Sequence, residues 1–389
     1  MLKAALISLG SVSSQWTLEE MRKYFDVVDD ISIKDLEVFI QPQGKGTKVL
    51  YKSKPLGEYD CIFCKGSYRY ASLLRAICII YKNKCYIPYD PSAFTIGHDK
   101  LLTHLKFQEH NVPMPRTYIP SNIKLAKSIL ETITYPIIMK FPQGTQGKGV
   151  MFADSFASAS SILDALSTLR QPLIIQEFID TGGVDTRAIV IGEKVYCAMQ
   201  RRAVAGESRA NIHAGGKGES CTLDKKTERV ALMAAKSIGA EICAVDILPS
   251  AKGPVVIEIN LSPGLQGITE ATGKNVAGAI AKYLYENTKK FKENEKQNGT
   301  EAIMKDVGIE TVIASNGKNG NNGNEYSDNS EKNDENKDND KFNQDIITNI
   351  RLRGEKILLP EFVTELSELD EDDEVIINVD KGKIYVKKV

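Results

Sequence analysis

The segment from Ala244 to Gly267, AVDILPSAKGPVVIEINLSPGLQG, constrains the possible fold and function of this chain more than any other segment. Alternation in a strand puts Glu258 and Asn260 on one face and the apolar residues between and beside them on the other. Asp246 lies on the preceding apolar run. Together, the three side chains would form an open cage of oxygen ligands for a hard divalent ion such as Mg²⁺. The alternative is a half-exposed strand whose polar face meets water.

A glycine-rich loop follows an earlier apolar strand, in YPIIMKFPQGTQGKGV. Lys140 ends the strand, and Gly144, Gly147 and Gly149 follow before Val150 begins the next one. Glycines let backbone N–H groups approach phosphate oxygens closely. The spacing matches neither a Walker A loop nor a Rossmann fingerprint. A simple hairpin turn is the alternative, but the lysine and the downstream acids favour a phosphate-binding loop.

The strand-like run Leu173–Gln176 is followed by Glu177 and Phe178. Such a strand edge suits an adenine, because backbone groups can bond its edge and an aromatic ring can pack on its face. A carboxylate such as Glu177 would then take the ribose hydroxyls. The sequence therefore predicts a nucleotide-binding edge here.

A series of arginines comes next in the chain: Arg187, Arg201, Arg202 and Arg209. Arg209 is followed closely by Asn211 and His213 in a glycine-flanked loop. The fixed fork of arginine matches carboxylate and phosphate groups, so several in one cleft would neutralise an anionic substrate. Scattered solvated arginines are the alternative for any one of them.

These motifs together resemble the RimK-type branch of the ATP-grasp ligases. The matching segments are HDK with Lys100, Lys140 with GTQGKGV, QEF, DTR, QRR, SRANIHAGG, VDIL, EINLSPGLQGI and TGKNVAG. The resemblance implies ATP contacts from Lys100, Lys140, Glu177, Phe178, Asp185, Arg209, Ala210 and Asn211. It also implies two Mg²⁺ or Mn²⁺ ions held by Asp246, Glu258 and Asn260. Ala214 stands where the family pattern N-x-H-R-G-G has arginine, so the acceptor specificity stays open.

The resemblance implies ligation through an acyl phosphate. An acceptor carboxylate attacks the γ-phosphate of ATP, and the amine of an amino acid, expected to be L-glutamate, displaces phosphate. We expect Arg209 and Asn211 to stabilise the oxyanion and Arg187 and Arg201 to anchor carboxylates. The acceptor could be a ribosomal protein C-terminus, a glutamylated deazaflavin or pterin coenzyme, or an amino-group carrier protein of lysine biosynthesis.

Composition agrees with a cytoplasmic enzyme. The 389 residues carry a net charge of −1, which points to neither nucleic acid nor membrane as a partner. Seven cysteines favour a reducing compartment over a disulfide framework. The N-terminal KAALISLG reads as a first β-strand and not as a signal peptide. His98, His104 and His110 lie near a helical segment without a constellation of carboxylates, so the sequence does not favour a metal site there.

We predict an α/β (α+β) chain with an ATP-grasp fold in four parts. Residues 1–90 form an N-terminal α/β domain that precedes the ATP-grasp domain, with strands at Ala4–Ser8, Cys61–Cys64 and Cys85–Tyr89 and a helix at Tyr70–Tyr81. Residues 91–287 form the ATP-grasp domain itself. A linker follows at 288–344, where ten of the twenty-eight residues from Asn316 to Asn343 are asparagine, too polar to bury a core.

In the last part, residues 345–389, the sequence predicts an apolar strand, a helix that begins at Pro360, an acidic turn and a hairpin that closes at Asp380–Gly382. This part resembles AbrB-like swapped-hairpin domains, whose single chains cannot bury a core and therefore pair. This implies a small β-rich dimerisation domain and a homo-oligomer. Seven Lys or Arg residues stand against eleven Asp or Glu residues there, so binding to the DNA backbone is less favoured than pairing. A DNA-binding regulator whose ATP-grasp body senses a ligand is the alternative function.

Overall fold

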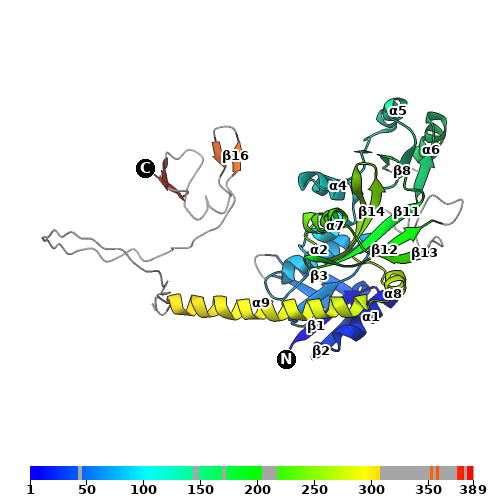
Figure 1. The fold of residues 1–389 in the computed structure, drawn as a ribbon. Coiled ribbons are helices and arrows are strands. Elements are labelled where there is room, and N and C mark those ends of the chain that lie inside the picture. The colour runs from blue at the N-terminus through cyan, green and yellow to red at the C-terminus, as the bar shows by residue number, and fades with distance from the viewer. Residues whose placement is uncertain are drawn as a thin grey trace, which may run out of the picture. The chain divides into compact units, whose positions relative to one another are not determined.

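A computed structural model describes residues 1–42, 46–142, 149–168, 172–203 and 217–306, and strands within 351–388. The chain divides into two units, Met1–Val312 and Ile313–Val389. Within the described residues, the first unit contains a parallel sheet, two larger antiparallel sheets and a small antiparallel one (Figure 1).

The N-terminal layer is a parallel sheet in the order β2–β1–β6. Its elements are β1 (Lys3–Ser8), α1 (Val12–Met21), β2 (Val27–Ser32), β6 (Cys61–Cys64) and α2 (Ala71–Tyr81). The side chains of β1 and β6 are almost all buried, as expected for parallel strands covered on both faces. The short helices Ile33–Asp35 and Tyr68–Tyr70 and the sheet β3 (Leu36–Ile40), β4 (Thr47–Tyr51) and β5 (Lys54–Pro55) complete this part.

Two of the three strands predicted for this layer, and its helix, are confirmed. The predicted strand Cys85–Tyr89 is not, because this segment makes only isolated bridges, Cys61 with Tyr86 and Tyr89 with Ala240. Pro88 lies inside the segment and has no N–H to donate, which prevents a continuous ladder.

A four-stranded antiparallel sheet in the order β7–β10–β8–β9 follows. Its strands are β7 (Thr117–Tyr118), β8 (Ile137–Lys140), β9 (Val150–Ala153) and β10 (Ile174–Glu177), and it packs with α5 (Ile123–Thr132) and α6 (Phe156–Thr168). The buried apolar residues of these elements form a cluster separate from the main core. This sheet therefore has a hydrophobic core of its own.

The main core lies around a five-stranded antiparallel sheet in the order β13–β12–β11–β14–β15. These strands are β11 (Val184–Ile191), β12 (Lys194–Arg202), β13 (Lys217–Cys221), β14 (Ile242–Ser250) and β15 (Gly253–Asn260). Helices α3 (Ala93–Gly97), α4 (Lys100–Glu109), α7 (Lys225–Ser237), α8 (Gln266–Thr272) and α9 (Val276–Asp306) complete the unit.

Local sequence explains where several helices begin. The side chains of Ser11, Asp99, Asn122 and Asp224 each accept a hydrogen bond from a backbone N–H in the first turn of α1, α4, α5 and α7. Such caps satisfy N–H groups that have no partner inside the helix. None of the helices in the described part of the chain is long and apolar enough to cross a membrane.

Helix α9 continues past residue 288, where the sequence predicts the linker to begin. Thr288 is fully buried, and Lys292 Nζ forms an ion pair with Asp60 Oδ1 at 2.8 Å. These contacts hold the helix against the N-terminal layer beyond the predicted boundary. Only a few residues of this segment pack against the protein, so its composition is mostly polar. For that reason the sequence predicts a linker where the helix continues.

In the second unit, strands pair as two antiparallel hairpins. They are β16 (Arg351–Arg353) with β17 (Lys356–Leu358), and β18 (Val375–Asp380) with β19 (Lys383–Lys388). The predicted hairpin closing at 380–382 is confirmed by the pairing of β18 with β19. The helix predicted after Pro360 lies outside the described residues, and the resemblance to AbrB-like domains stays a prediction.

The tail yields a prediction about assembly. The β18–β19 register sets Ile377 opposite Val386, whereas Asn378 lies opposite Tyr385. Two-stranded hairpins are marginally stable alone, so we expect the tail to associate with a second copy. Ile377→Asp should lower the molecular mass measured by sedimentation to that of a single chain, and Asn378→Asp, its matched control, should not. A wild-type protein that sediments as a monomer would contradict this prediction.

Candidate active site

Charged residues follow one another across the five-stranded sheet. The register sets Asp185 of β11 opposite Arg201 of β12, and Arg187 of β11 opposite Asp246 of β14. Asp246 in turn lies opposite Glu258 of β15. Residues directly opposite each other share a face of the sheet. We call these five residues the charge row.

Short ion pairs join four members of the charge row. Arg187 donates from Nε to Asp246 Oδ1 and from Nη2 to Oδ2, both at 2.7 Å. Arg201 donates from Nε to Asp185 Oδ1 at 2.6 Å and from Nη2 to Oδ2 at 2.7 Å. Arg201 Nη2 also lies 3.0 Å from Asp246 Oδ2. Asp246 therefore sits between two guanidinium groups.

The two aspartates respond differently to burial. Burial disfavours the charged form of Asp246, but Arg187 and Arg201 outweigh it and hold its pKa well below the usual range. Burial raises the pKa of Asp185 to about 6, and its bonds with Arg201 only partly oppose that rise. Asp246 is therefore the firmly ionised carboxylate of the pair.

Arg201 does not fit its predicted role as a substrate anchor. Its side chain is 3% exposed and its guanidinium already bonds two carboxylates. Arg187 is 17% exposed and has Nη1 outside its bonds to Asp246. Arg187 can therefore contribute a donor to a substrate, whereas Arg201 holds the sheet together.

Glu258 and Asn260 lie two residues apart on β15, beside Asp246. The amide nitrogen of Asn260 is buried and has no hydrogen-bond partner among the described residues. A side-chain amide can turn by 180°, so Oδ1 can take this position, and a cation there would favour it. Asp246 Oδ1 accepts one hydrogen bond and has a lone pair left. Two carboxylates and an amide oxygen fit a hard divalent ion.

No group of three or more His, Cys, Asp or Glu side chains within the described ranges could hold a metal ion. The Asp246 and Glu258 pair therefore needs the Asn260 amide, or atoms from other molecules, to complete a coordination shell. The predicted donor set has two carboxylates and an amide, so it would not count as such a group, and it stays a prediction.

Lys140 occupies the end of β8 in the neighbouring sheet. It is 6% exposed, and its Nζ donates to Gln176 Oε1 at 2.9 Å. Burial lowers the pKa of Lys140 to about 8, the positive charge of Lys100 adds to the fall, and the Glu258 carboxylate opposes it. Lys100, Lys140 and Glu258 therefore interact electrostatically across two sheets and a helix.

Two residues of the predicted nucleotide-binding strand edge already contact other residues of the protein. Glu177 Oε1 accepts a hydrogen bond from Arg116 N at 2.8 Å. The Phe178 ring meets Phe152 edge-on, with centroids 5.1 Å apart. Gly149 has a φ of +78°, and a Cβ there would collide with the ring of Phe141, so this loop end requires glycine.

The loop after β15 is tied to the N-terminal layer. Gly66 N donates to Ser262 Oγ at 2.8 Å, and Leu265 N donates to Ser13 Oγ at 2.8 Å. The end of the strand that carries Glu258 is therefore braced by the first sheet of the chain.

Comparison with known proteins decides the family. Residues 97–284 match the RimK-like ATP-grasp domain. A probable alpha-L-glutamate ligase from Shewanella loihica is 40% identical over 199 residues, which cover 51% of this chain and 66% of that relative. Another from Thioalkalivibrio sulfidiphilus is 36% identical over 252 residues, covering 64% of this chain and 84% of the relative. The chain belongs to the RimK-like ATP-grasp ligase family.

The fold agrees with that family. The ATP-grasp ligase PsnB, solved with a minimal precursor, Mg and ADP, aligns with a TM-score of 0.57 and 17% identity. The alignment covers 74% of this chain and 98% of PsnB. The predicted ATP-grasp fold is thus confirmed, and ATP with Mg²⁺ is the ligand pair of ATP-grasp ligases.

Several predicted RimK-like site residues lie outside the described residues. They are Gly144, Gly147, Arg209, Ala210 and Asn211. Their roles stay predictions. Sequence reasoning also missed two residues, His104 and Thr117, which contact Gln176 and through it Lys140. The only signal for His104 is its position four residues after Lys100, one turn along the same helix face.

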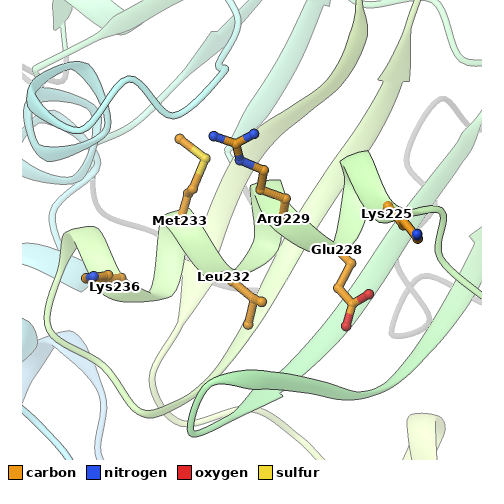
Figure 2. Close-up of a pocket in the computed structure, with 6 residues that line it drawn as sticks. All are labelled: Lys225, Glu228, Arg229, Leu232, Met233 and Lys236. Carbon is orange, nitrogen blue, oxygen red and sulfur yellow. The ribbon is translucent and has the colours of Figure 1, made fainter.

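The hollow shown in Figure 2 is a different place. It lies along α7 and is lined by Lys225, Glu228, Arg229, Leu232, Met233 and Lys236. No residue of the charge row lines it, so it is not part of the candidate active site.

The ion pairs yield a prediction about stability. Arg201→Met leaves buried Asp185 without its partner and should lower the free energy of unfolding by about 3–5 kcal/mol. Arg187→Met should cost less, about 1.5–3 kcal/mol, because Asp246 keeps Arg201. Urea unfolding followed by circular dichroism compares the two variants. A larger loss for Arg187→Met would show that the burial argument is wrong.

Proposed function

We propose that this protein is an ATP-dependent carboxylate–amine ligase that adds an amino acid, most consistently L-glutamate, to a carboxylate acceptor. The observation that carries the proposal is the strand register that sets Asp246 opposite Glu258, two residues from Asn260, whose amide nitrogen is buried with no partner in the described part of the chain. The names of the two relatives, probable alpha-L-glutamate ligase, support glutamate as the added amino acid. The acceptor would be a protein C-terminus or a coenzyme carboxylate.

In this proposal Asp246, Glu258 and Asn260 hold two Mg²⁺ or Mn²⁺ ions. Bound there, the ions would neutralise charge on the β- and γ-phosphates of ATP. Lys140 and Lys100 supply positive charge for the phosphates. Lys140 is buried, and its one hydrogen-bond partner among the described residues is the neutral Gln176; both facts support this, because a buried ammonium favours an anion beside it.

Other residues would bind the rest of the nucleotide. Glu177 and Phe178 would receive the ribose and adenine, with one oxygen of Glu177 already engaged by a backbone N–H. The glycine loop around Gly149 would cover the phosphates. Asp185 fits an indirect role better than a direct ATP contact, because both of its oxygens accept from Arg201.

The chemistry then follows in two steps. A carboxylate oxygen of the acceptor bonds to the γ-phosphorus as the bond to ADP breaks, which gives an acyl phosphate. The amine nitrogen attacks the carbonyl carbon, loses a proton, and phosphate leaves. Arg187 would bind a carboxylate through Nη1, which lies outside its bonds to Asp246, and Arg209 and Asn211 would donate to the oxyanion. The products are the amide, ADP and phosphate.

An ADP-release assay tests the whole proposal. Purified protein with Mg²⁺ or Mn²⁺ should release ADP only when an acceptor carboxylate and an amino acid are both present. Mass spectrometry should find an acceptor heavier by one or more amino-acid residues. Release of AMP and pyrophosphate, or a mass increase of another kind, would rule out the acyl-phosphate route.

Removing one negative charge from Glu258 tests the proposed metal site. Glu258→Gln keeps the shape of the side chain but removes a negative charge, so turnover should fall by at least a hundredfold, about 2.7 kcal/mol, while the fold is kept. Affinity for ATP should fall mainly when metal is present. Glu193→Gln, a matched change at an exposed turn, should leave turnover unchanged. Wild-type turnover in Glu258→Gln would place Glu258 on an ordinary solvated strand face.

A further inference from the structure

The side-chain amide of Gln176 links three elements. Its Oε1 accepts from Lys140 Nζ at 2.9 Å. Its Nε2 lies 2.7 Å from Thr117 Oγ1 and 3.2 Å from His104 Nε2. An amide has one accepting oxygen and one donating nitrogen, so these contacts require a particular orientation. If the amide turned over, its NH₂ group would face the Lys140 ammonium.

His104 favours the same orientation of the Gln176 amide as Lys140 does. The Nδ1 atom of His104 lies 2.5 Å from the carbonyl oxygen of Lys100, which can only accept, so Nδ1 carries the proton. In the neutral ring, Nε2 is then an acceptor and requires a donor from Gln176. Burial lowers the pKa of His104 to about 4, and the charge of Lys140 adds to this, so the ring is neutral at ordinary pH.

Thr117 cannot determine the orientation. Its hydroxyl donates to Pro115 O at 2.9 Å and accepts from Gln176 Nε2. A hydroxyl can rotate and donate instead, so it would satisfy either orientation of the amide. Apart from Lys140 itself, only His104 distinguishes the oxygen of Gln176 from its nitrogen in this network.

Lys140 needs this arrangement because it is buried. Its ammonium has three N–H groups, and Gln176 Oε1 is its one hydrogen-bond partner among the described residues. Holding one N–H leaves two for a ligand and limits the positions that the nitrogen can take. A group held in place before binding loses less entropy when the ligand arrives.

We propose that His104 and Gln176 are positioning residues for Lys140, with His104 fixing the Gln176 amide so that its oxygen faces the ammonium. This rests on the proposed contact of Lys140 with the nucleotide. In this role His104 acts through Gln176 and makes no direct contact with the nucleotide. The role is therefore separable from those of the residues that bind ATP directly.

The test measures the dissociation constant of MgATP for the full chain by isothermal titration calorimetry, which needs no acceptor. Gln176→Met and His104→Leu, both close in volume to the residues they replace, should each weaken binding about tenfold. Thr117→Val removes the other partner of the same amide nitrogen and should change binding less than twofold. Thermal unfolding of each variant checks that the fold is kept.

The double variant gives the decisive result. If His104 acts through Gln176, His104→Leu adds nothing to Gln176→Met, and the pair should weaken binding about tenfold. A hundredfold loss, the product of two independent effects, would overturn the proposal. So would wild-type binding in His104→Leu, or equal losses in Thr117→Val and Gln176→Met. If His104→Leu does not fold, the comparison of Thr117→Val with Gln176→Met tests the proposal instead.

The same titrations separate this proposal from the function on which it rests. If wild-type protein does not bind MgATP, the proposed function fails. If wild-type protein binds and Lys140→Met binds weakly, but His104→Leu binds like wild type, only the positioning role fails.

Discussion

Asp246 is the group on which the candidate site depends. It is a carboxylate buried in an interior strand, and it can stay charged there only because Arg187 and Arg201 donate to it. The two arginines come from β11, which lies beside the strand of Asp246, and from β12, the next strand in the sheet. The antiparallel register must therefore hold for the charge to be neutralised, since a slip of one residue would turn these side chains to the other face. The same register brings Glu258 beside Asp246.

The candidate site also draws on two separately packed cores. Asp246 and Glu258 belong to the five-stranded sheet, whereas Lys140 and Gln176 belong to the four-stranded sheet. Glu258 nevertheless favours the charged form of Lys140, so the two sheets interact through their charges. A ligase that joins phosphate, metal and acceptor needs both kinds of group, anionic for the metal and cationic for the phosphates. In the proposed function the five-stranded sheet supplies the anionic groups for the metal, the four-stranded sheet supplies Lys140 for the phosphates, and each sheet has its own core.

Much of this could be predicted where the information is local. Glu258 and Asn260 share a face because strand alternation has a period of two, and Lys140 ends an apolar run before glycines. Predictions failed where a distant contact decides. The Cys85–Tyr89 segment has strand composition but makes only isolated bridges around Pro88. Helix α9 reads as polar linker beyond residue 288, yet Thr288 and Lys292 pack on the N-terminal layer.

The sequence alone determined the kinds of group at the candidate site and the local elements that carry them: the acids, the lysines, the glycine loop and the capped helices. The tertiary structure decided which of them meet. Arg201 reads as a substrate anchor until Asp185 and Asp246 are seen to hold it. The contact of His104 with Gln176, seventy-two residues away, is likewise visible only in the structure. The reason is physical: burial makes an unpaired charge or amide costly, and which partner relieves that cost depends on how distant strands and helices pack.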